Sequence, residues 1–284
     1  MSTDLLIDKI IALKNPTVAG LDPVIEFLPE GMINGSSKKA HAEAILKFNK
    51  ELIDALYDIV PAVKPQSAYY EMLGYEGVKT LFETISYAKS KGMYVITDAK
   101  RNDIGTTAEA YSKAYFDGTE SDALTVNAYL GWDGIKPFIK PEKAIYVLVK
   151  TSNKSSGDLQ DLILENGKRI YEHMGDMVEE WGNNSIGAHG YSNIGAVVGA
   201  TYPQQLKALR ERLKNTFFLV PGYGAQGAGA KDIASGFING IGSIINSSRG
   251  IMCAYKNQKL PAEQFAESAR TEAIRMRDEI NSVI

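Results

Sequence analysis

Residues 98–107, Asp-Ala-Lys-Arg-Asn-Asp-Ile-Gly-Thr-Thr, contain the side chains best suited to proton transfer. They follow the apolar run 93–97, and polar residues at the carboxyl end of a buried parallel strand commonly face a ligand. Asp98 and Lys100 project to the same side of an extended chain, while the alanine between them projects to the other. Because carboxylates at Asp98 and Asp103 flank the lysine, we expect Lys100 to stay protonated and able to donate a proton. The competing interpretation is a solvated strand end with weak surface ion pairs.

A second group of residues could bind an anion. Residues 220–229 read Val-Pro-Gly-Tyr-Gly-Ala-Gln-Gly-Ala-Gly, and residues 246–250 read Asn-Ser-Ser-Arg-Gly. Glycines let backbone N–H groups approach phosphate oxygens, Gln226 can donate a hydrogen bond, and Arg249 offers two parallel donors. The pattern predicts a phosphorylated ligand. The alternative is a flexible loop with Arg249 in a surface ion pair.

Eight apolar, strand-like runs alternate with helix-like segments. The strand candidates are 18–21, 62–63, 93–97, 123–126, 144–149, 194–198, 216–220 and 241–245. The helix candidates are an amphipathic opening helix around 5–13, then 38–57, 77–91, 106–115, 166–181, 203–213 and 261–281, with weaker helices after Gly131 and after Ala230. This alternation without a linker predicts an α/β fold, a single-domain (β/α)8 TIM barrel over 1–284, rather than an open doubly wound sheet.

A barrel of this kind places its functional residues at the carboxyl ends of the strands. Strand one ends at Asp22, strand two at Lys64, and strand three at the 98–107 segment. Because these ends adjoin, we expect Lys64 to join Asp98, Lys100 and Asp103 in a cluster of alternating charges. The glycine-rich loop follows strand seven and Arg249 follows strand eight, which is the usual phosphate site of this barrel.

The same glycines also spell a weaker motif. Gly222, Gly224 and Gly227 form G-x-G-x-x-G, the pattern of a dinucleotide-binding turn. That motif opens a βαβ unit, whereas this one follows the seventh strand candidate and its glycines continue to Gly229. We therefore reject a dinucleotide-binding domain.

Composition excludes several other classes. The 284 residues are 44% hydrophobic and 23% charged, and a net charge of −3 without a long basic block gives no basis for nucleic-acid binding. Cys253 is the only cysteine, and His41, His173 and His189 have no metal-ligand spacing, so we expect neither a disulfide nor a metal site. No run approaches a membrane span and the amino terminus lacks a secretory pattern. We expect a soluble, cytoplasmic protein.

With these residues assembled, the sequence resembles the orotidine 5′-phosphate decarboxylase family, in its longer bacterial branch. The similarity covers nearly the whole barrel and is carried by residues 98–107, 221–226 and the pair Ser248-Arg249, in the expected order. It implies the decarboxylation of orotidine 5′-monophosphate (OMP) to UMP and CO2, the last step of de novo pyrimidine nucleotide synthesis, without a metal or an organic cofactor.

The resemblance also implies a role for each matching residue. Lys64, Asp98, Lys100 and Asp103 match the family's charge array, with Lys100 as the proton donor to C6. Asp103, Ile104 and Thr107 would reach into the partner's site, which implies a homodimer. The remaining matches are substrate contacts: Asp22 for the ribose hydroxyls, Ser152 (or its neighbours Thr151, Ser155 and Ser156) for the pyrimidine, and Gln226 with Arg249 for the phosphate, beside Pro221 and Ser248.

Three other functions fit part of the pattern. A sugar-phosphate decarboxylase or epimerase shares the barrel and the D-x-K-x-x-D strand end, but uses its carboxylates to hold Mg²⁺. An aldolase would form a Schiff base on Lys100, although a charged lysine is a poor nucleophile. A catalytically silent barrel would bind a nucleotide through Arg249 but gain little from charges beside a ligand carboxylate. The long connection 157–193 receives no function from the sequence.

Overall fold

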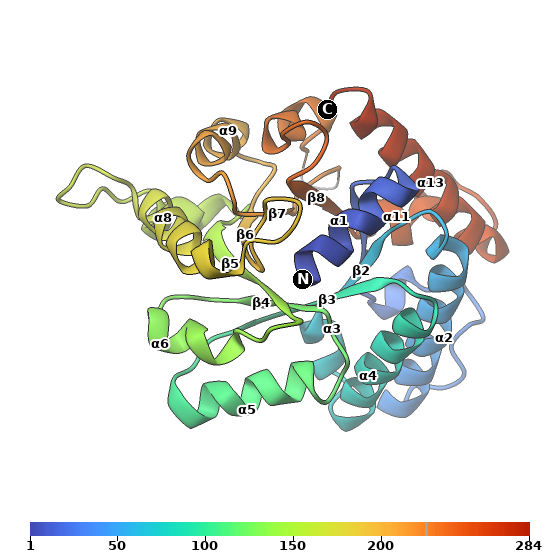
Figure 1. Ribbon diagram of the computed structural model, residues 1–284. Coiled ribbons are helices and arrows are strands. Elements are labelled where there is room, and N and C mark those ends of the chain that lie inside the picture. The colour runs from blue at the N-terminus through green and yellow to red at the C-terminus, as the bar shows by residue number, and fades with distance from the viewer. Residues whose placement is uncertain (225–226) are drawn as a thin grey trace.

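Eight parallel strands close into one barrel, with the helices outside it (Figure 1). The computed structural model describes residues 1–224 and 227–284. Each strand pairs with the next in sequence, and β8 pairs with β1, which confirms the predicted TIM barrel. The strands are β1 (Thr17–Leu21), β2 (Ala62–Pro65), β3 (Tyr94–Arg101), β4 (Ala123–Val126), β5 (Ala144–Lys150), β6 (Ile194–Val198), β7 (Phe218–Val220) and β8 (Ser243–Ser247).

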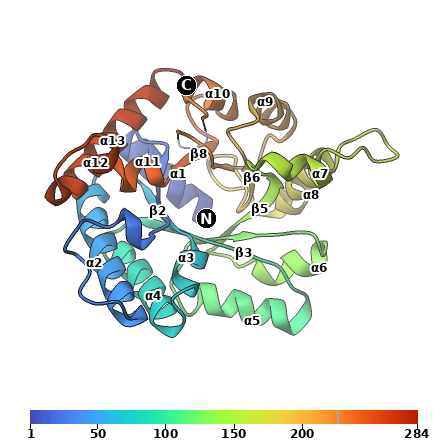
Figure 2. The ribbon, with the colours of Figure 1, turned by 180° about the vertical axis from the view of Figure 1, so that it is seen from behind.

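Most of the helices lie around the outside of the barrel (Figures 1 and 2). The α-helices are α1 (Ser2–Leu13), α2 (Lys38–Leu56), α3 (Ser67–Glu71), α4 (Tyr75–Ser90), α5 (Gly105–Phe116), α6 (Trp132–Ile135), α7 (Gly157–Gln160), α8 (Ile170–Gly182), α9 (Pro203–Arg212), α10 (Ala230–Ile233), α11 (Arg249–Met252), α12 (Ala254–Asn257) and α13 (Phe265–Asn281). Short 3-10 turns are η1 (Ile25–Phe27), η2 (Lys136–Phe138), η3 (Lys154–Ser156), η4 (Asn183–Ser185), η5 (Ala234–Gly236) and η6 (Ala262–Gln264). Within the described part of the chain, no helix is long and apolar enough to cross a membrane.

The opening helix α1 covers the amino-terminal end of the barrel. Its Leu6 and Ile7 are fully buried against the barrel residues of the same apolar cluster. At its start, the hydroxyls of Ser2 and Tyr94 lie 2.8 Å apart. In Figure 1 this helix begins near the centre of the ring and runs toward α13. Because this end is closed, the carboxyl ends of the strands form the open face of the barrel.

Several element boundaries differ from those predicted, and two of the differences have a clear cause in the backbone. The segment 166–169 is not helical: Ile163 and Arg169 form an antiparallel bridge, and Gly167 has φ +80°, so the chain turns back before α8 begins. This hairpin projects from the barrel between α7 and α8 in both views (Figures 1 and 2). Strand β8 begins at Ser243 rather than at 241, because Gly242 has φ +102° and interrupts the extended backbone before it.

A buried arginine joins α9 to the segments that precede β7 and β8. Arg210 is 3% exposed, and its guanidinium lies 3.7 Å from the centre of the Phe218 ring. All three of its nitrogens donate hydrogen bonds to backbone oxygens, namely those of Gly236, Leu213, Thr216 and Gly242, at 2.7 to 2.9 Å. The side chain therefore satisfies four carbonyl groups that have little access to water.

We expect Arg210→Met to lower the free energy of unfolding by about 3 kcal/mol, because buried acceptors lose charged donors. Lys207→Met on the same helix removes only an exposed lysine, whose ammonium lies 3.9 Å from Glu211. This substitution should change the free energy of unfolding by less than about 0.5 kcal/mol. Urea unfolding of both variants measures the difference. Equal stabilities of the two variants would contradict the role assigned to Arg210.

Candidate active site

The open face of the barrel contains a pocket of about 660 Å³. It lies at the carboxyl ends of the strands, as predicted for this architecture. The side chains that line it include Asp22, Lys64, Gln66, Asp98, Lys100, Thr125, Thr151, Ser152, Ser155, Ser156, Asp158, Pro221, Tyr223, Asn246, Ser248 and Arg249. Most of the residues selected from the sequence therefore border one cavity.

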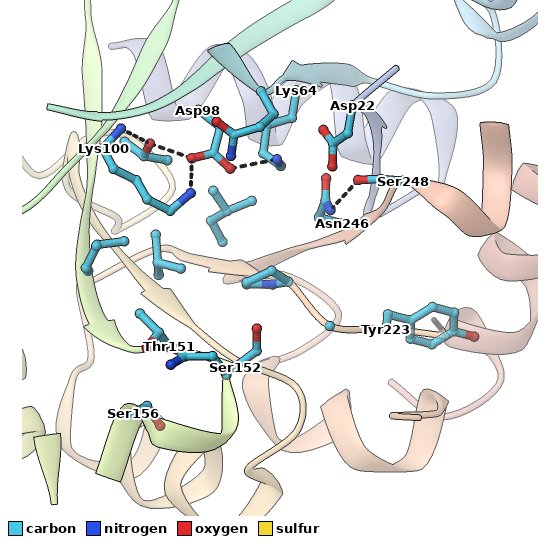
Figure 3. Close-up of a pocket in the computed structure, with 18 of the residues that line it drawn as sticks. Asp22, Lys64, Asp98, Lys100, Thr151, Ser152, Ser156, Tyr223, Asn246 and Ser248 are labelled. Carbon is cyan, nitrogen blue, oxygen red and sulfur yellow. Dashed lines mark hydrogen bonds and ion pairs between the residues drawn. The ribbon is translucent and has the colours of Figure 1, made fainter. Parts of the chain in front are cut away.

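Asp98 lies at the centre of the charged wall of this pocket (Figure 3). Its Oδ2 accepts a hydrogen bond from Lys64 Nζ at 2.8 Å, and its Oδ1 accepts one from Lys100 Nζ at 2.5 Å. The side chains of Lys64 and Asp98 are 5% and 10% exposed, whereas that of Lys100 is 44% exposed. Lys64 and Asp98 are thus a buried pair, and Lys100 extends from it into the cavity.

The charges of this cluster support one another. Burial disfavours the ionised form of Asp98, but Lys64 and Lys100 outweigh it and hold the pKa of this carboxyl far below its usual range. Burial also opposes the charge on Lys64, yet the carboxylates of Asp98 and Asp22 raise the pKa of its ammonium above the usual value. Asp98 and Lys64 therefore remain ionised at neutral pH, despite their burial.

Lys100 reaches Asp98 through an irregular backbone rather than through simple alternation. Its φ is +48°, in the left-handed region, and the pairing of β3 with β4 shifts register between Thr97 and Arg101. Thr125 on β4 supports this conformation, because its hydroxyl accepts from the Lys100 backbone N–H at 3.0 Å and donates to Asp98 Oδ1 at 2.8 Å. Thr125 was not among the site residues predicted from the sequence, although it is a hydroxyl residue within an apolar run.

Two buried acceptors face the pocket beside this cluster. Asp22 Oδ1 and Asn246 Oδ1 have no hydrogen-bond partner among the described residues. Asn246 Nδ2 donates to Ser248 Oγ at 3.2 Å, which orients the amide. A Cβ at Gly20 would lie 1.9 Å from Ser248 Oγ, so β1 needs glycine here. Unpaired buried acceptors in a cavity suit a ligand with hydroxyl donors; Asn246 had not been selected from the sequence.

The opposite wall is formed by the chain after β5. Figure 3 shows the Ser152 side chain directed into the pocket, across from Asp98. Arg249 begins α11 at the rim, next to Ser248 and Pro221, and none of the ion pairs among the described residues includes it. Gln226 lies outside the described residues. The cavity thus has a charged wall, a hydroxyl-bearing wall and an arginine at its edge.

Asp103 is separated from the other three predicted charges. It does not line the pocket of its own chain, and its Oδ1 accepts a hydrogen bond from the Ile104 backbone N–H at 2.8 Å. Ile104 and Thr107 are exposed residues at the start of α5. The expected four-charge cluster is therefore a three-charge cluster within one chain, because the backbone turns outward after β3.

Both oxygens of Asp98 are already engaged by cationic donors. Among the described residues, no group of three or more His, Cys, Asp or Glu side chains is placed to share a metal ion. A (β/α)8 barrel that presents ammonium groups, a carboxylate and an arginine around one pocket has the arrangement of a barrel enzyme acting on a small anionic substrate.

The comparisons identify the family. A profile described as "Orotidine 5′-phosphate decarboxylase / HUMPS family" matches residues 27–265. An orotidine 5′-phosphate decarboxylase of Clostridium perfringens is 44% identical over 290 residues, covering 100% of this chain and 99% of its own, and one of Rhodopirellula baltica is 43% identical, covering 93% of each. The solved Leishmania donovani OMP decarboxylase has a TM-score of 0.80 at 33% identity, covering 99% of this chain and 98% of its own. The chain belongs to the orotidine 5′-phosphate decarboxylase / HUMPS family.

We expect Asp98→Asn to lower the free energy of unfolding by about 3 kcal/mol near neutral pH, because the buried Lys64 loses its counter-ion. Since the folded protein lowers the pKa of Asp98, this stabilisation is present above about pH 4 and is lost as the pH falls through the lower, folded-state pKa. Urea unfolding at a series of pH values should therefore show that the wild type has a higher free energy of unfolding than Asp98→Asn, by a difference that shrinks below about pH 4. Asp158→Asn, at an exposed carboxylate of the same pocket, is the control; an equal loss in both variants would contradict the pairing.

Proposed function

We propose that the protein decarboxylates OMP to UMP and CO2 in the de novo synthesis of pyrimidine nucleotides. The observation that carries this proposal is the ionised Asp98 between Lys64 and Lys100 in a pocket of nucleotide size. The names of the relatives support it, because both curated proteins are orotidine 5′-phosphate decarboxylases. We further propose that the reaction takes place in the cytoplasm.

The charge cluster can drive the loss of CO2 without another reagent. With the substrate carboxylate beside Asp98, two negative charges oppose each other in the bound ground state. When the bond between C6 and the carboxylate breaks, CO2 leaves as a neutral molecule and the electron pair remains on C6. The repulsion therefore falls as the reaction proceeds, while the ammonium of Lys100 stabilises the growing charge on carbon.

Lys100 also completes the reaction. Its side chain is the most exposed of the three in the cluster and lines the cavity. In the proposed mechanism it donates one proton to the C6 carbanion, which yields UMP, and recovers a proton from water once the product leaves. Lys64 stays paired with Asp98 and keeps the carboxylate ionised throughout.

The other pocket residues would bind the rest of the nucleotide. In this proposal Asp22 accepts hydrogen bonds from the ribose hydroxyls, which agrees with its unpartnered buried oxygen. Ser152 contacts the pyrimidine from the wall opposite Asp98. The phosphate lies at the rim, and its proposed contacts are Pro221, Gln226, Ser248 and Arg249.

We also propose a homodimer in which each chain completes the partner's site. Asp103, Ile104 and Thr107 lie outside their own pocket, so they are available to a second chain. Ile104 is 54% exposed, and the neighbouring connection after β4 exposes Tyr129 and Leu130. Apolar side chains of this size at a protein surface are typical of an association site.

A sugar-phosphate enzyme that uses Mg²⁺ is the remaining alternative within the barrel class. It requires carboxylate oxygens that are free to bind the ion. Here Asp98 Oδ2 accepts from Lys64 and Oδ1 accepts from both Lys100 and Thr125. The geometry therefore favours the charge-driven decarboxylation.

We expect rapid conversion of OMP to UMP in the presence of EDTA, and a loss of at least about a thousandfold in kcat for Lys100→Ala, since the variant lacks both the stabilising charge and the proton donor. The change in ultraviolet absorbance as OMP is consumed measures the rate. Lys154→Ala, an exposed lysine outside the pocket, should keep the wild-type rate. Activity that appears only after Mg²⁺ is restored would instead support the sugar-phosphate class.

The shared site predicts complementation between two inactive variants. In a mixed dimer of Lys100→Ala and Asp103→Ala chains, one site combines an intact Lys100 with the partner's intact Asp103. After random exchange of subunits, the mixture should regain roughly one quarter of the wild-type activity. Co-expression with two different affinity tags isolates the mixed dimer for assay. No recovery in the mixed dimer would contradict a site shared between chains.

A further inference from the structure

Lys150, the last residue of β5, is a buried charge that the proposed reaction does not use. Its side chain is 0% exposed, although a lysine is almost never fully buried unless it is paired. Its Nζ donates to Asp161 Oδ1 at 2.9 Å and to Ser156 Oγ at 3.1 Å, and lies 4.5 Å from the centre of the Tyr202 ring. These contacts satisfy an ammonium group that would otherwise be costly to remove from water.

Two of these partners belong to the loop 151–161, which forms the wall of the pocket opposite Asp98. The two ends of this loop are also bound to each other. Gln160 Oε1 accepts from the Thr151 backbone N–H at 3.0 Å, and Gln160 Nε2 donates to Thr151 Oγ1 at 2.8 Å. Lys150 therefore lies beneath a closed loop and is satisfied only while that loop keeps this shape.

The middle of the loop is attached to the connection between β6 and α9. Thr201 Oγ1 donates to the Ser152 carbonyl at 3.0 Å, and the Tyr202 hydroxyl donates to the Asn153 carbonyl at 3.0 Å. A Cβ on Gly199 would lie 2.8 Å from Ser152 Cα, so the main chain of Ser152 packs directly on this connection. Tyr202 therefore has two roles: its ring lies over the Lys150 ammonium, and its hydroxyl holds the loop.

We propose that Lys150 is a positioning residue that fixes Ser152 at the pyrimidine end of the substrate site, an inference that rests on the function proposed above. If the ammonium is removed, Asp161 and Ser156 lose their shared donor, and the loop no longer has a buried charge that requires it to stay closed. The phosphate end of the site follows β7 and β8 and lies outside this unit. Lys150 therefore acts on recognition of the base rather than of the sugar phosphate.

The test compares ligands with and without the base. We expect Lys150→Met, which keeps an unbranched side chain one atom shorter but removes the charge, to weaken UMP binding about tenfold, as for the loss of one charged hydrogen bond. Binding of ribose 5-phosphate, measured by the same calorimetric titration, should stay within about twofold. In turnover, KM for OMP should rise more than kcat falls. Lys154→Met makes the same chemical change at an exposed position of the loop and should alter neither ligand.

Asp161→Asn provides a second variant, since it weakens the same ion pair from a partly exposed position and should reproduce the selective loss of UMP affinity. Equal weakening of both ligands, or unchanged UMP affinity in either folded variant, would overturn the positioning role. If Lys150→Met does not fold, the Asp161→Asn result decides. Failure of the wild-type protein to bind UMP or to turn over OMP would reject the proposed function itself, and the inference with it.

Discussion

The site depends on one carboxylate that is kept ionised away from water. Asp98 is buried, and a charge in such a position is stable only when cations or strong donors surround it. Lys64 comes from β2, Lys100 from β3 and Thr125 from β4. These three adjacent strands must therefore end at the same level along the barrel axis to bring the groups together. The parallel barrel provides that alignment, and α1 seals its other end.

Much of this arrangement could be predicted because it is encoded locally. Apolar runs of strand length alternate with helical periodicity, and the charged residues come directly after the runs. Asp22, Lys64 and Asp98 all follow this rule, since a parallel strand buried on both faces tolerates charge mainly at its end. Arg249 after β8 and the glycines after β7 follow the same rule at the other side of the pocket.

The residues that the sequence did not reveal lie inside apolar runs or depend on distant contacts. Thr125 lies within an apolar segment, whereas Asn246 and Lys150 begin the polar stretches that follow theirs. In neither case does anything local distinguish a satisfied structural group from one that serves the site. Their importance comes from partners on other strands and loops. The hairpin before α8 was missed for a different reason: the helical pattern of 170–181 was extended back through Asn166-Gly167, a pair that favours a turn, and Gly167 has φ +80° there.

The left-handed backbone at Lys100 has a consequence for how this position can evolve. A residue with a side chain in this conformation costs about 1 kcal/mol relative to glycine, which adopts it freely. Replacement by glycine would relieve this strain, but it would also remove one of the two ammonium groups that keep the buried Asp98 ionised. A strained backbone and a charged partner for Asp98 therefore occur together at this one residue, so the position can change only if the carboxylate is satisfied in another way.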